Sequence, residues 1–343
     1  MRNHFGILED GRAVESLTLG TADGLQVEVL TYGAILRRLS FPVGGARRDF
    51  ILSFATLAEY ERDRAYVGPL VGRFGNRIAN SRFSIDGREH QVFANEGVNH
   101  LHGGMLGFGK RLWHVVNGDT PHLLGNGEYP HLRLAYRSPA GEEGYPGNLD
   151  VEVHFEIRGH SLAITLSAVT DAPTPVNLTY HPYFNINGAA SAPATQQRLR
   201  IPASRYLPVR PGLIPTGETA PVEGTTFDFR KSRPLAPPAI ETHPQLREAG
   251  GYDHCWLLDA DADCACELTS ANGDATLTLL GSGPGLQFYN GQFLSKTHPA
   301  IGSGVILEPQ GLPNAPNEPR FPNAILRPGE NYRATIEYRA RAN

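Results

Sequence analysis

Hydrophobic and polar residues alternate one by one in many short segments of this chain. The longest two are Leu149–Arg158 and Ser161–Thr170, and only a Gly-His pair separates them. A period of two places alternate side chains on opposite faces of a strand, and so short a glycine-containing link is typical of a hairpin. The pattern therefore predicts an antiparallel hairpin here, with further half-buried strands at Gln26–Tyr32 and Tyr332–Arg339.

Several shorter apolar runs between turn residues predict more strands. Their ranges are Tyr252–Leu258, Gly304–Leu307, and a predicted strand pair formed by Ala275–Leu280 and Gly285–Tyr289. Helices are expected only at Ala55–Asp63 and at Pro244–Ala249, where a Gly-Gly pair stops the second one. Many short strands with frequent turns indicate an all-β fold, a large antiparallel β-sandwich. No internal repeat or interior linker interrupts the chain, so a single domain over residues 1–343 is predicted.

Composition agrees with this prediction and excludes some classes of function. The 343 residues include 38 glycines and 27 prolines, which implies many turns, while 40% of the residues are hydrophobic and can fill a large core. The formal net charge is −4 and the arginines are scattered, so neither a nucleic acid nor an anionic membrane surface is an expected partner. No apolar run approaches 18 residues and the N-terminus has no apolar signal core, so a soluble cytoplasmic protein is expected.

The three cysteines do not form a recognisable framework. Cys255 precedes an apolar Trp-Leu-Leu run and is interpreted as a core residue. Cys264 and Cys266 could clip a metal ion, but the sequence has no second pair to complete a structural zinc site.

Two residues share a local pattern that is suited to acid–base chemistry. His181 and Glu308 each follow a short strand-like segment and each precede a proline, which disfavours a helical backbone at both positions. We therefore expect both residues at strand ends, where an imidazole and a carboxylate could face each other across a cleft. Taken alone, each pattern favours a structural role, with His181 a partly buried structural histidine and Glu308 a carboxylate in a surface loop.

The histidine-rich segment Asn99–Gly104 allows more than one interpretation. His100 and His102 are two residues apart, so on a strand they would share a face, as two metal ligands might. Alternatively, one of them points into a site and the other is at the surface, or the segment is a turn with incidental histidines.

Seven motifs in a fixed order resemble the aldose 1-epimerase (galactose mutarotase) family over nearly the whole chain. The resemblance implies a large antiparallel β-sandwich of the galactose mutarotase-like supersandwich type and an isomerase that interconverts the anomers of a free aldose. The motifs are FGNRI at 74–78, NHLHGG at 99–104, EGYPG at 143–147, HPYFN at 181–185, YDH at 252–254, GLQFY at 285–289 and EPQGLPNAPN at 308–317.

The resemblance also implies roles for individual residues. Glu308 maps to the catalytic base and His181 to the acid. Residues that bind or border the sugar map to Asn76, Arg77, His102, Asp253 and Gln287. No metal or cofactor is implied, and a monosaccharide is the expected partner, with no preference between a monomer and a weak dimer.

Two positions depart from the family pattern. Asn314 stands where the family usually has Asp, and we interpret it as a loop contact. Asn290-Gly291-Gln292 replaces a common Thr-Gly-Asn, which could alter the preferred sugar.

The expected mechanism opens and recloses the sugar ring. Glu308 would be ionised and take the proton of the anomeric hydroxyl O1, while a protonated His181 would give a proton to the ring oxygen O5. Negative neighbours, Glu308 and Asp253, are expected to raise the pKa of His181 and so to give a bell-shaped dependence of activity on pH.

Other functions compete with this interpretation. A sugar-binding module would need no acid–base pair, and a glycoside hydrolase would need a second carboxylate such as Asp253. A hexose-6-phosphate 1-epimerase would need extra cations in the cleft, for which Arg73 and Arg230 are candidates. A Schiff-base enzyme would use a lysine, but Lys110, Lys231 and Lys296 lie outside the core of the motifs. A metal enzyme would use His100 and His102.

Overall fold

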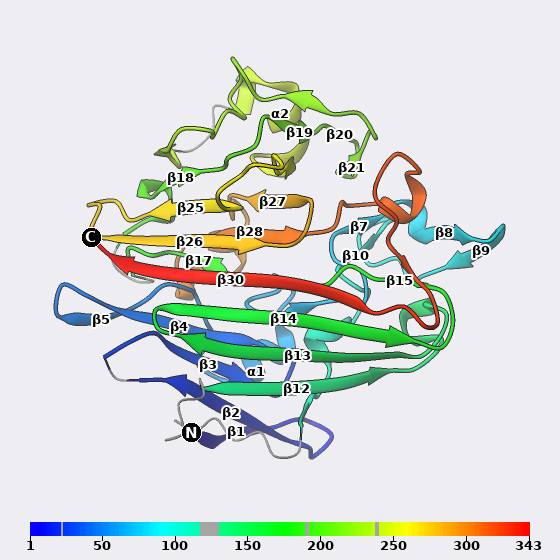
Figure 1. Cartoon of the computed structure of the whole chain (residues 1–343), viewed down its shortest axis with the longest axis horizontal. Coiled ribbons are helices and arrows are strands. Elements are labelled where there is room, and N and C mark those ends of the chain that lie inside the picture. Colours follow the sequence, from blue (N-terminus) through cyan, green and yellow to red (C-terminus); the bar gives the residue numbers. More distant parts are fainter. Residues whose placement is uncertain (22, 117–129, 189–191, 237–239) are drawn as a thin grey trace.

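The computed structural model describes residues 1–21, 23–116, 130–188, 192–236 and 240–343. Across these residues, antiparallel sheets make up most of the regular structure and the helices are short (Figure 1). The predicted all-β antiparallel class is therefore confirmed. The prediction of one domain stays a prediction, although the main hydrophobic cluster contains residues from Leu17 to Ala340.

The largest sheet in the described part of the chain has the strand order β11-β12-β13-β14-β30-β26-β25-β18-β23. Its C-terminal strand β30 (red in Figure 1) lies between β14 and β26. Strands β13 and β14 have the bounds predicted for the hairpin, because strict alternation of Val, Ile and Leu with polar residues buries one face of each strand. The bounds are β11 His114–Val115, β12 His131–Ser138, β13 Leu149–Arg158, β14 Ser161–Thr170, β18 Arg198–Arg200, β23 Arg233–Pro234, β25 Cys266–Thr269, β26 Ala275–Gly281 and β30 Tyr332–Ala342.

A second sheet, with the strand order β17-β28-β27-β24-β19-β22, carries much of the candidate site. Trp256, Leu286, Phe288 and Leu307 on one face of this sheet belong to the main hydrophobic cluster. The residues that alternate with them face the other way. The bounds are β17 Tyr183–Phe184, β19 Arg205–Leu207, β22 Ala220–Pro221, β24 Asp253–Leu257, β27 Gly285–Tyr289 and β28 Val305–Gln310.

An N-terminal sheet in the order β1-β2-β3-β4-β5 packs on the main cluster through residues such as Val27 and Leu39. Its bounds are β1 Arg2–Ile7, β2 Ala13–Gly20, β3 Gln26–Leu30, β4 Leu36–Val43 and β5 Ala46–Asp49. Short strand pairs complete the described sheets. They are β6 Leu70–Val71 with β16 Thr179–Tyr180, β7 Arg77–Ile78 with β10 His100–Leu101, β8 Arg82–Ile85 with β9 Arg88–Gln91, β15 Thr174–Pro175 with β29 Ile325–Leu326, and β20 Val209–Arg210 with β21 Ile214–Pro215.

Both helices that the sequence predicts are present. Helix α1 spans Leu57–Arg62, and Thr56 and Glu59 form a capping box at its N-terminus. Helix α2 spans Pro244–Ala249 and ends at Gly250 in the left-handed conformation. A third helix, α3 at Leu294–Thr297, has a single turn. Within the described residues no helix is both long enough and apolar enough to cross a membrane.

Two predictions about strands are wrong. Ala275–Gly281 and Gly285–Tyr289 do not pair with each other, because β26 pairs with β25 and β30 whereas β27 pairs with β24 and β28. Glu308 does not lie at a strand end but within β28, opposite Gln287. Pro309 is tolerated there because β17 pairs with β28 only at Val305 and Ile306, so that further along β27 is the strand partner of β28.

Candidate active site

The floor of the site is the polar face of the second sheet. Gln287 on β27 lies directly opposite Glu308 on β28 and opposite Cys255 on β24, and Asp253 lies two residues before Cys255. Side chains two apart on a strand share a face, so Asp253, Gln287 and Glu308 point to the same side of the sheet. The opposite face is filled by the apolar residues of the main cluster, which makes this floor rigid.

The wall above the floor comes from the pair β7 and β10. Asn76 and His102 both have positive φ, at 62° and 49°, a conformation that is strained for residues other than glycine. The two residues hold each other in place. The His102 backbone amide donates to the Asn76 backbone carbonyl at 3.1 Å, and the Asn76 backbone amide donates to Nδ1 of His102 at 3.2 Å. Since Nδ1 accepts this bond, the proton of neutral His102 is on Nε2.

His181 lies in the two-residue gap between β16 and β17, as expected for a residue where a strand stops. Its backbone is bonded on both sides, to the Pro69 carbonyl at 3.2 Å and to the Gly68 amide at 3.0 Å. Its Nδ1 donates to the Tyr66 carbonyl at 2.7 Å, so Nε2 is the nitrogen that can exchange a proton with a ligand. The His181 ring is 5.1 Å from the ring of His102.

These residues bring three titratable groups together. One side-chain nitrogen from each of His102 and His181 and one carboxylate oxygen of Glu308 all lie within 4.8 Å of one another, and all three residues are buried. Oε1 of Glu308 is buried and has no hydrogen-bond partner among the described residues. A buried acceptor of this kind can receive the proton of a bound hydroxyl group.

Burial controls the protonation of this cluster. It lowers the pKa of His181 to about 4, and hydrogen bonding to the Tyr66 carbonyl opposes the shift. It raises the pKa of Glu308 well above its usual range, with Asp253 adding to the rise and Arg77 opposing it. Burial also lowers the pKa of His102, with the neighbouring His181 and Arg77 adding to it. The prediction that negative neighbours raise the pKa of His181 is therefore wrong, because desolvation of the imidazolium dominates.

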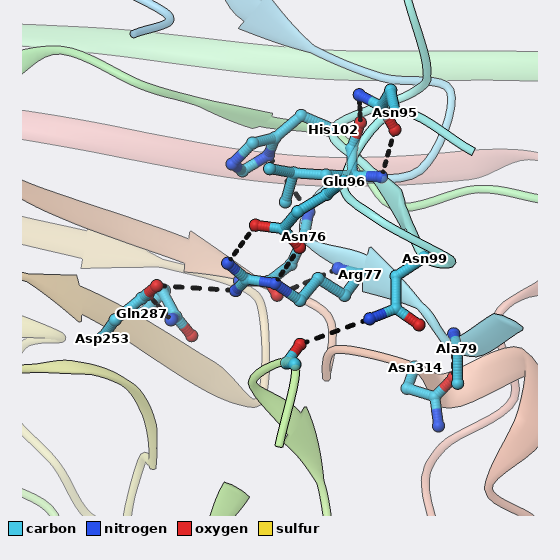
Figure 2. A network of polar contacts seen from close by, with 12 residues as sticks. Asn76, Arg77, Ala79, Asn95, Glu96, Asn99, His102, Asp253, Gln287 and Asn314 are labelled. Atoms are coloured by element: carbon cyan, nitrogen blue, oxygen red, sulfur yellow. Dashed lines mark hydrogen bonds and ion pairs between the residues drawn. The ribbon is translucent and has the colours of Figure 1, made fainter. Parts of the chain in front are cut away.

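A chain of charged and polar side chains surrounds Arg77 (Figure 2). Arg77 binds Glu96 through two bonds, Nε to Oε2 at 2.6 Å and Nη2 to Oε1 at 2.7 Å, and its Nη1 lies 3.5 Å from Oδ2 of Asp253. Gln287 donates to the other Asp253 oxygen at 2.6 Å. Burial raises the pKa of Asp253 and Arg77 opposes the rise.

A pocket of about 360 Å³ opens over this cluster, within the size range of small-molecule sites. Six of the seven predicted site residues line it, and Gln287 instead contacts Asp253 from beside the pocket. The lining residues from the prediction are Asn76, Arg77, His102, His181, Asp253 and Glu308.

Several pocket residues were not predicted from the sequence. Glu96 follows Asn95 in a short turn and belongs to no strand or motif. Nothing in the neighbouring sequence therefore indicates that it pairs with Arg77. Tyr66 contacts both histidine rings, at 4.8 Å from His102 and 5.8 Å from His181. The only sequence signal for Tyr66 was its position just before the glycine-rich segment that leads into FGNRI. Phe293 and His298, from the α3 region, line the mouth.

His100 lies outside the pocket. Its Nδ1 is bonded to the Phe93 carbonyl and its Nε2 to the Tyr145 hydroxyl, both at 2.6 Å, so both ring nitrogens are engaged in the interior. The interpretation of His100 and His102 as paired metal ligands is therefore wrong. His102, His181 and Glu308 are residue types that bind divalent metals. However, the proton on Nε2 of His102 blocks metal coordination by that nitrogen, so the cluster is better suited to proton transfer.

The cations considered for a sugar phosphate or a Schiff base are also elsewhere. Arg73 is buried and donates to Ser138 and to backbone carbonyls, and Arg230 pairs with Asp228. Neither residue lines the pocket. The Lys110 amine donates to the Tyr60 and Glu61 carbonyls.

Asn314 supports the wall from behind. Its backbone amide donates to the Arg77 carbonyl at 2.8 Å, and its side-chain Oδ1 accepts from the Ala79 backbone amide at 2.9 Å. Asn314 is therefore a loop contact, as interpreted from the sequence. The segment Asn290-Gly291-Gln292, which also departs from the family pattern, has a structural role as well. Oδ1 of Asn290 accepts a hydrogen bond from the Tyr252 backbone amide at 2.6 Å.

The fold and the site define a protein built on large antiparallel sheets, with a buried histidine–glutamate cluster that opens into a small-molecule pocket. The sequence model of the family described as aldose 1-epimerase matches residues 15–339, and the chain belongs to this family. The chain is 39% identical over 346 residues to galactose mutarotase from Sus scrofa, covering 97% of this chain and 96% of the relative. It is 37% identical over 343 residues to aldose 1-epimerase from Escherichia coli K12, covering 96% of each.

A solved structure gives the same result. The crystal structure of galactose 1-epimerase from Lactobacillus acidophilus NCFM superposes with a TM-score of 0.85 at 27% identity, covering 100% of this chain and 98% of that chain.

Proposed function

We propose that this protein interconverts the α and β anomers of a free aldose, such as galactose or glucose, by opening and reclosing the sugar ring. The observation that supports this best is the buried, unpartnered Oε1 of Glu308 in a cluster with His181, inside a pocket of monosaccharide size. The aldose 1-epimerase relatives support the same reaction.

Ring opening moves two protons and breaks one bond. The Glu308 carboxylate takes the proton from O1, the electrons of the O1–H bond form the C1=O1 double bond, and the C1–O5 bond breaks as Nε2 of His181 gives its proton to O5. After rotation about C1–C2, the reverse transfers close the ring on the other face. Arg77 and the Nε2–H of His102 donate hydrogen bonds to sugar oxygens, and Asp253 accepts them.

The pKa shifts give this pair a specific resting state. A carboxylic acid with a neutral imidazole holds the same number of protons as a carboxylate with an imidazolium. Burial favours the neutral pair in the free protein. The neutral pair is also the state that follows ring opening, so the pocket matches the open-chain aldehyde. Binding a cyclic sugar then requires one proton to move from Glu308 to His181.

The variant Glu308→Gln separates an enzyme from a sugar-binding module. The amide has nearly the same size and can still contact a hydroxyl group, but it cannot take the O1 proton. We expect sugar binding to persist, measured by calorimetry, while catalysed anomer exchange is lost. Loss of binding together with exchange would favour a binding role for Glu308 over a catalytic one.

A further inference from the structure

Glu96 is held rigidly at the edge of the pocket although no motif contains it. Its amide donates to the Asn99 carbonyl at 3.1 Å and its carbonyl accepts from the Asn99 amide at 3.0 Å, which closes a tight turn with φ of +60° at Gly97. The preceding Asn95 fastens the turn to Leu101, accepting from its amide at 2.7 Å and donating to its carbonyl at 2.9 Å. The backbone of Glu96 therefore has a fixed position, from which its carboxylate reaches Arg77.

This carboxylate occupies one edge of the Arg77 guanidinium. Two of the three guanidinium nitrogens bind Glu96, which leaves Nη1 directed toward Asp253 (Figure 2). The Arg77 side chain is 7% exposed, whereas that of Glu96 is 36% exposed and lines the pocket. A paired edge fixes the plane of the guanidinium, since a bidentate pair has a defined geometry.

We propose that Glu96 is a positioning and specificity-determining residue, which limits Arg77 to a single 3.5 Å contact with Asp253 and makes the pocket select uncharged sugars. Without Glu96, the nearest strong acceptor for Arg77 is Asp253, and a bidentate pair between them would withdraw both groups from the sugar. The proposal rests on the proposed epimerase activity and adds a residue to it.

The charges that line the pocket support the selectivity. Three carboxylates, those of Glu96, Asp253 and Glu308, share this wall and floor with one buried cation, Arg77, and Arg64 adds an exposed cation at the rim. Replacing Glu96 with a neutral residue removes one negative charge from the side where a sugar binds. An anionic sugar should gain from this change and a neutral sugar should not.

The same change should alter proton binding at Glu308 through its neighbours. The charged and titratable groups that act on the cluster include Arg77, Glu96, Asp253, His100, His102, His181, Tyr66, Tyr183, Tyr289, Cys255 and Tyr338. Glu96 contributes to the raised pKa of Asp253, and Asp253 contributes to the raised pKa of Glu308, whereas Arg77 lowers it. Arg77 is the neighbour that lowers the pKa of Glu308, so a guanidinium released from the Glu96 carboxylate favours the Glu308 carboxylate, and the acid should lose its proton at a lower pH.

The experiment compares the wild type with Glu96→Gln, Glu96→Asp and the control Glu28→Gln. Glu28 pairs with Arg37 at 2.6 Å and lies outside the pocket, and its side chain is more shielded than that of Glu96, at 12% against 36% exposed. The Glu28→Gln variant therefore loses an ion pair without touching the site. Polarimetry gives kcat and KM for D-galactose and D-galacturonate across the pH range, and thermal melting reports folding.

For Glu96→Gln we expect KM for D-galactose to rise about tenfold or more with kcat within about threefold, because Arg77 contacts bind the ground state and the transition state alike. The ratio of kcat/KM for D-galacturonate over D-galactose should rise about tenfold, equivalent to one close charge. The alkaline limb of kcat/KM should move to lower pH. Glu96→Asp keeps the negative charge and should keep the selectivity for neutral sugar. Its KM for D-galactose should rise, but by less than in Glu96→Gln.

A Glu96→Gln variant that matches the wild type and Glu28→Gln in KM, selectivity and pH profile would overturn the proposal. If Glu96→Gln does not fold, Glu96→Ala takes its place as the neutral variant. Unchanged KM in Glu96→Asp together with unchanged selectivity in Glu96→Ala would then overturn the proposal as well. These results differ from failure of the proposed function, in which the wild type itself accelerates anomer exchange of no aldose.

Discussion

Nδ1 of His181 lies 2.7 Å from the carbonyl oxygen of Tyr66, and this bond decides which nitrogen of the imidazole can act on a sugar. The carbonyl can only accept, so Nδ1 keeps its proton and Nε2 exchanges one. Tyr66 has a φ of +58°, which turns its carbonyl to His181 while its ring lies against both His181 and His102. A backbone contact thus positions the proposed acid.

Tyr66 should therefore matter through its ring and backbone more than through its hydroxyl. We expect Tyr66→Phe to change kcat by no more than about threefold, because it loses only a 3.3 Å hydrogen bond with Asn95. Tyr66→Ala removes the ring that packs against both imidazoles and should lower kcat about 10- to 100-fold through their misplacement. Equal losses in both variants, measured by steady-state polarimetry, would contradict this role.

The activity should have a broad, bell-shaped dependence on pH. The pair must share one proton, so activity falls on the acid side as His181, with a pKa lowered to about 4, takes a second proton. It falls on the alkaline side as Glu308, whose pKa is raised, loses the shared proton. The measurement is kcat/KM for D-galactose after subtraction of the uncatalysed rate. An alkaline limb near pH 6.5, where an ordinary imidazolium loses its proton, would indicate instead that the pKa of His181 is not lowered.

The folded protein should lose stability as the pH falls below about 6.5. Buried histidines whose folded pKa is lowered, to about 4 for His100 and His181 and about 3 for His254, resist protonation that the unfolded chain accepts. By pH 4, the lowered pKa of His181 alone reduces the free energy of unfolding by about 3 kcal/mol. Glu308 acts oppositely, since its raised pKa costs stability above about pH 4.5 and this cost disappears in acid. Three histidines outweigh it, so the melting temperature should fall from pH 7 to pH 5, and a rise would contradict this account.

Asn314 offers a matched pair of variants for the wall that carries Arg77. Asn314→Asp keeps an oxygen to accept from the Ala79 amide, so kcat and KM should stay within about threefold of the wild type. Asn314→Ala loses this acceptor and leaves the amide unpaired, which should raise KM several-fold and lower the melting temperature. The opposite order of the two variants would show that the residue does more than hold the loop.

Local patterns in the sequence predicted much of this structure. The β13–β14 hairpin and helix α2 have the predicted bounds, since alternation, proline and glycine act over a few residues. The pairing of β26 with β27 was wrong because alternation identifies a strand but not its partner. Most site residues were identified through motifs that resemble a known family. The pKa of His181 and the role of Glu96 depend on burial and on contacts between distant segments, which no local pattern contains. The cytoplasmic location stays a prediction.

The measurement that tests the central claim most directly is polarimetry of freshly dissolved α-D-galactose and α-D-glucose with the wild type, Glu308→Gln and His181→Asn. We expect the wild type to accelerate the approach to anomeric equilibrium for at least one sugar. Each variant should lower kcat about 10²- to 10⁴-fold, the usual contribution of a general acid or base, while the fold is retained. A Glu308→Gln variant with wild-type kcat would contradict the assignment of Glu308 and His181 as the acid–base pair.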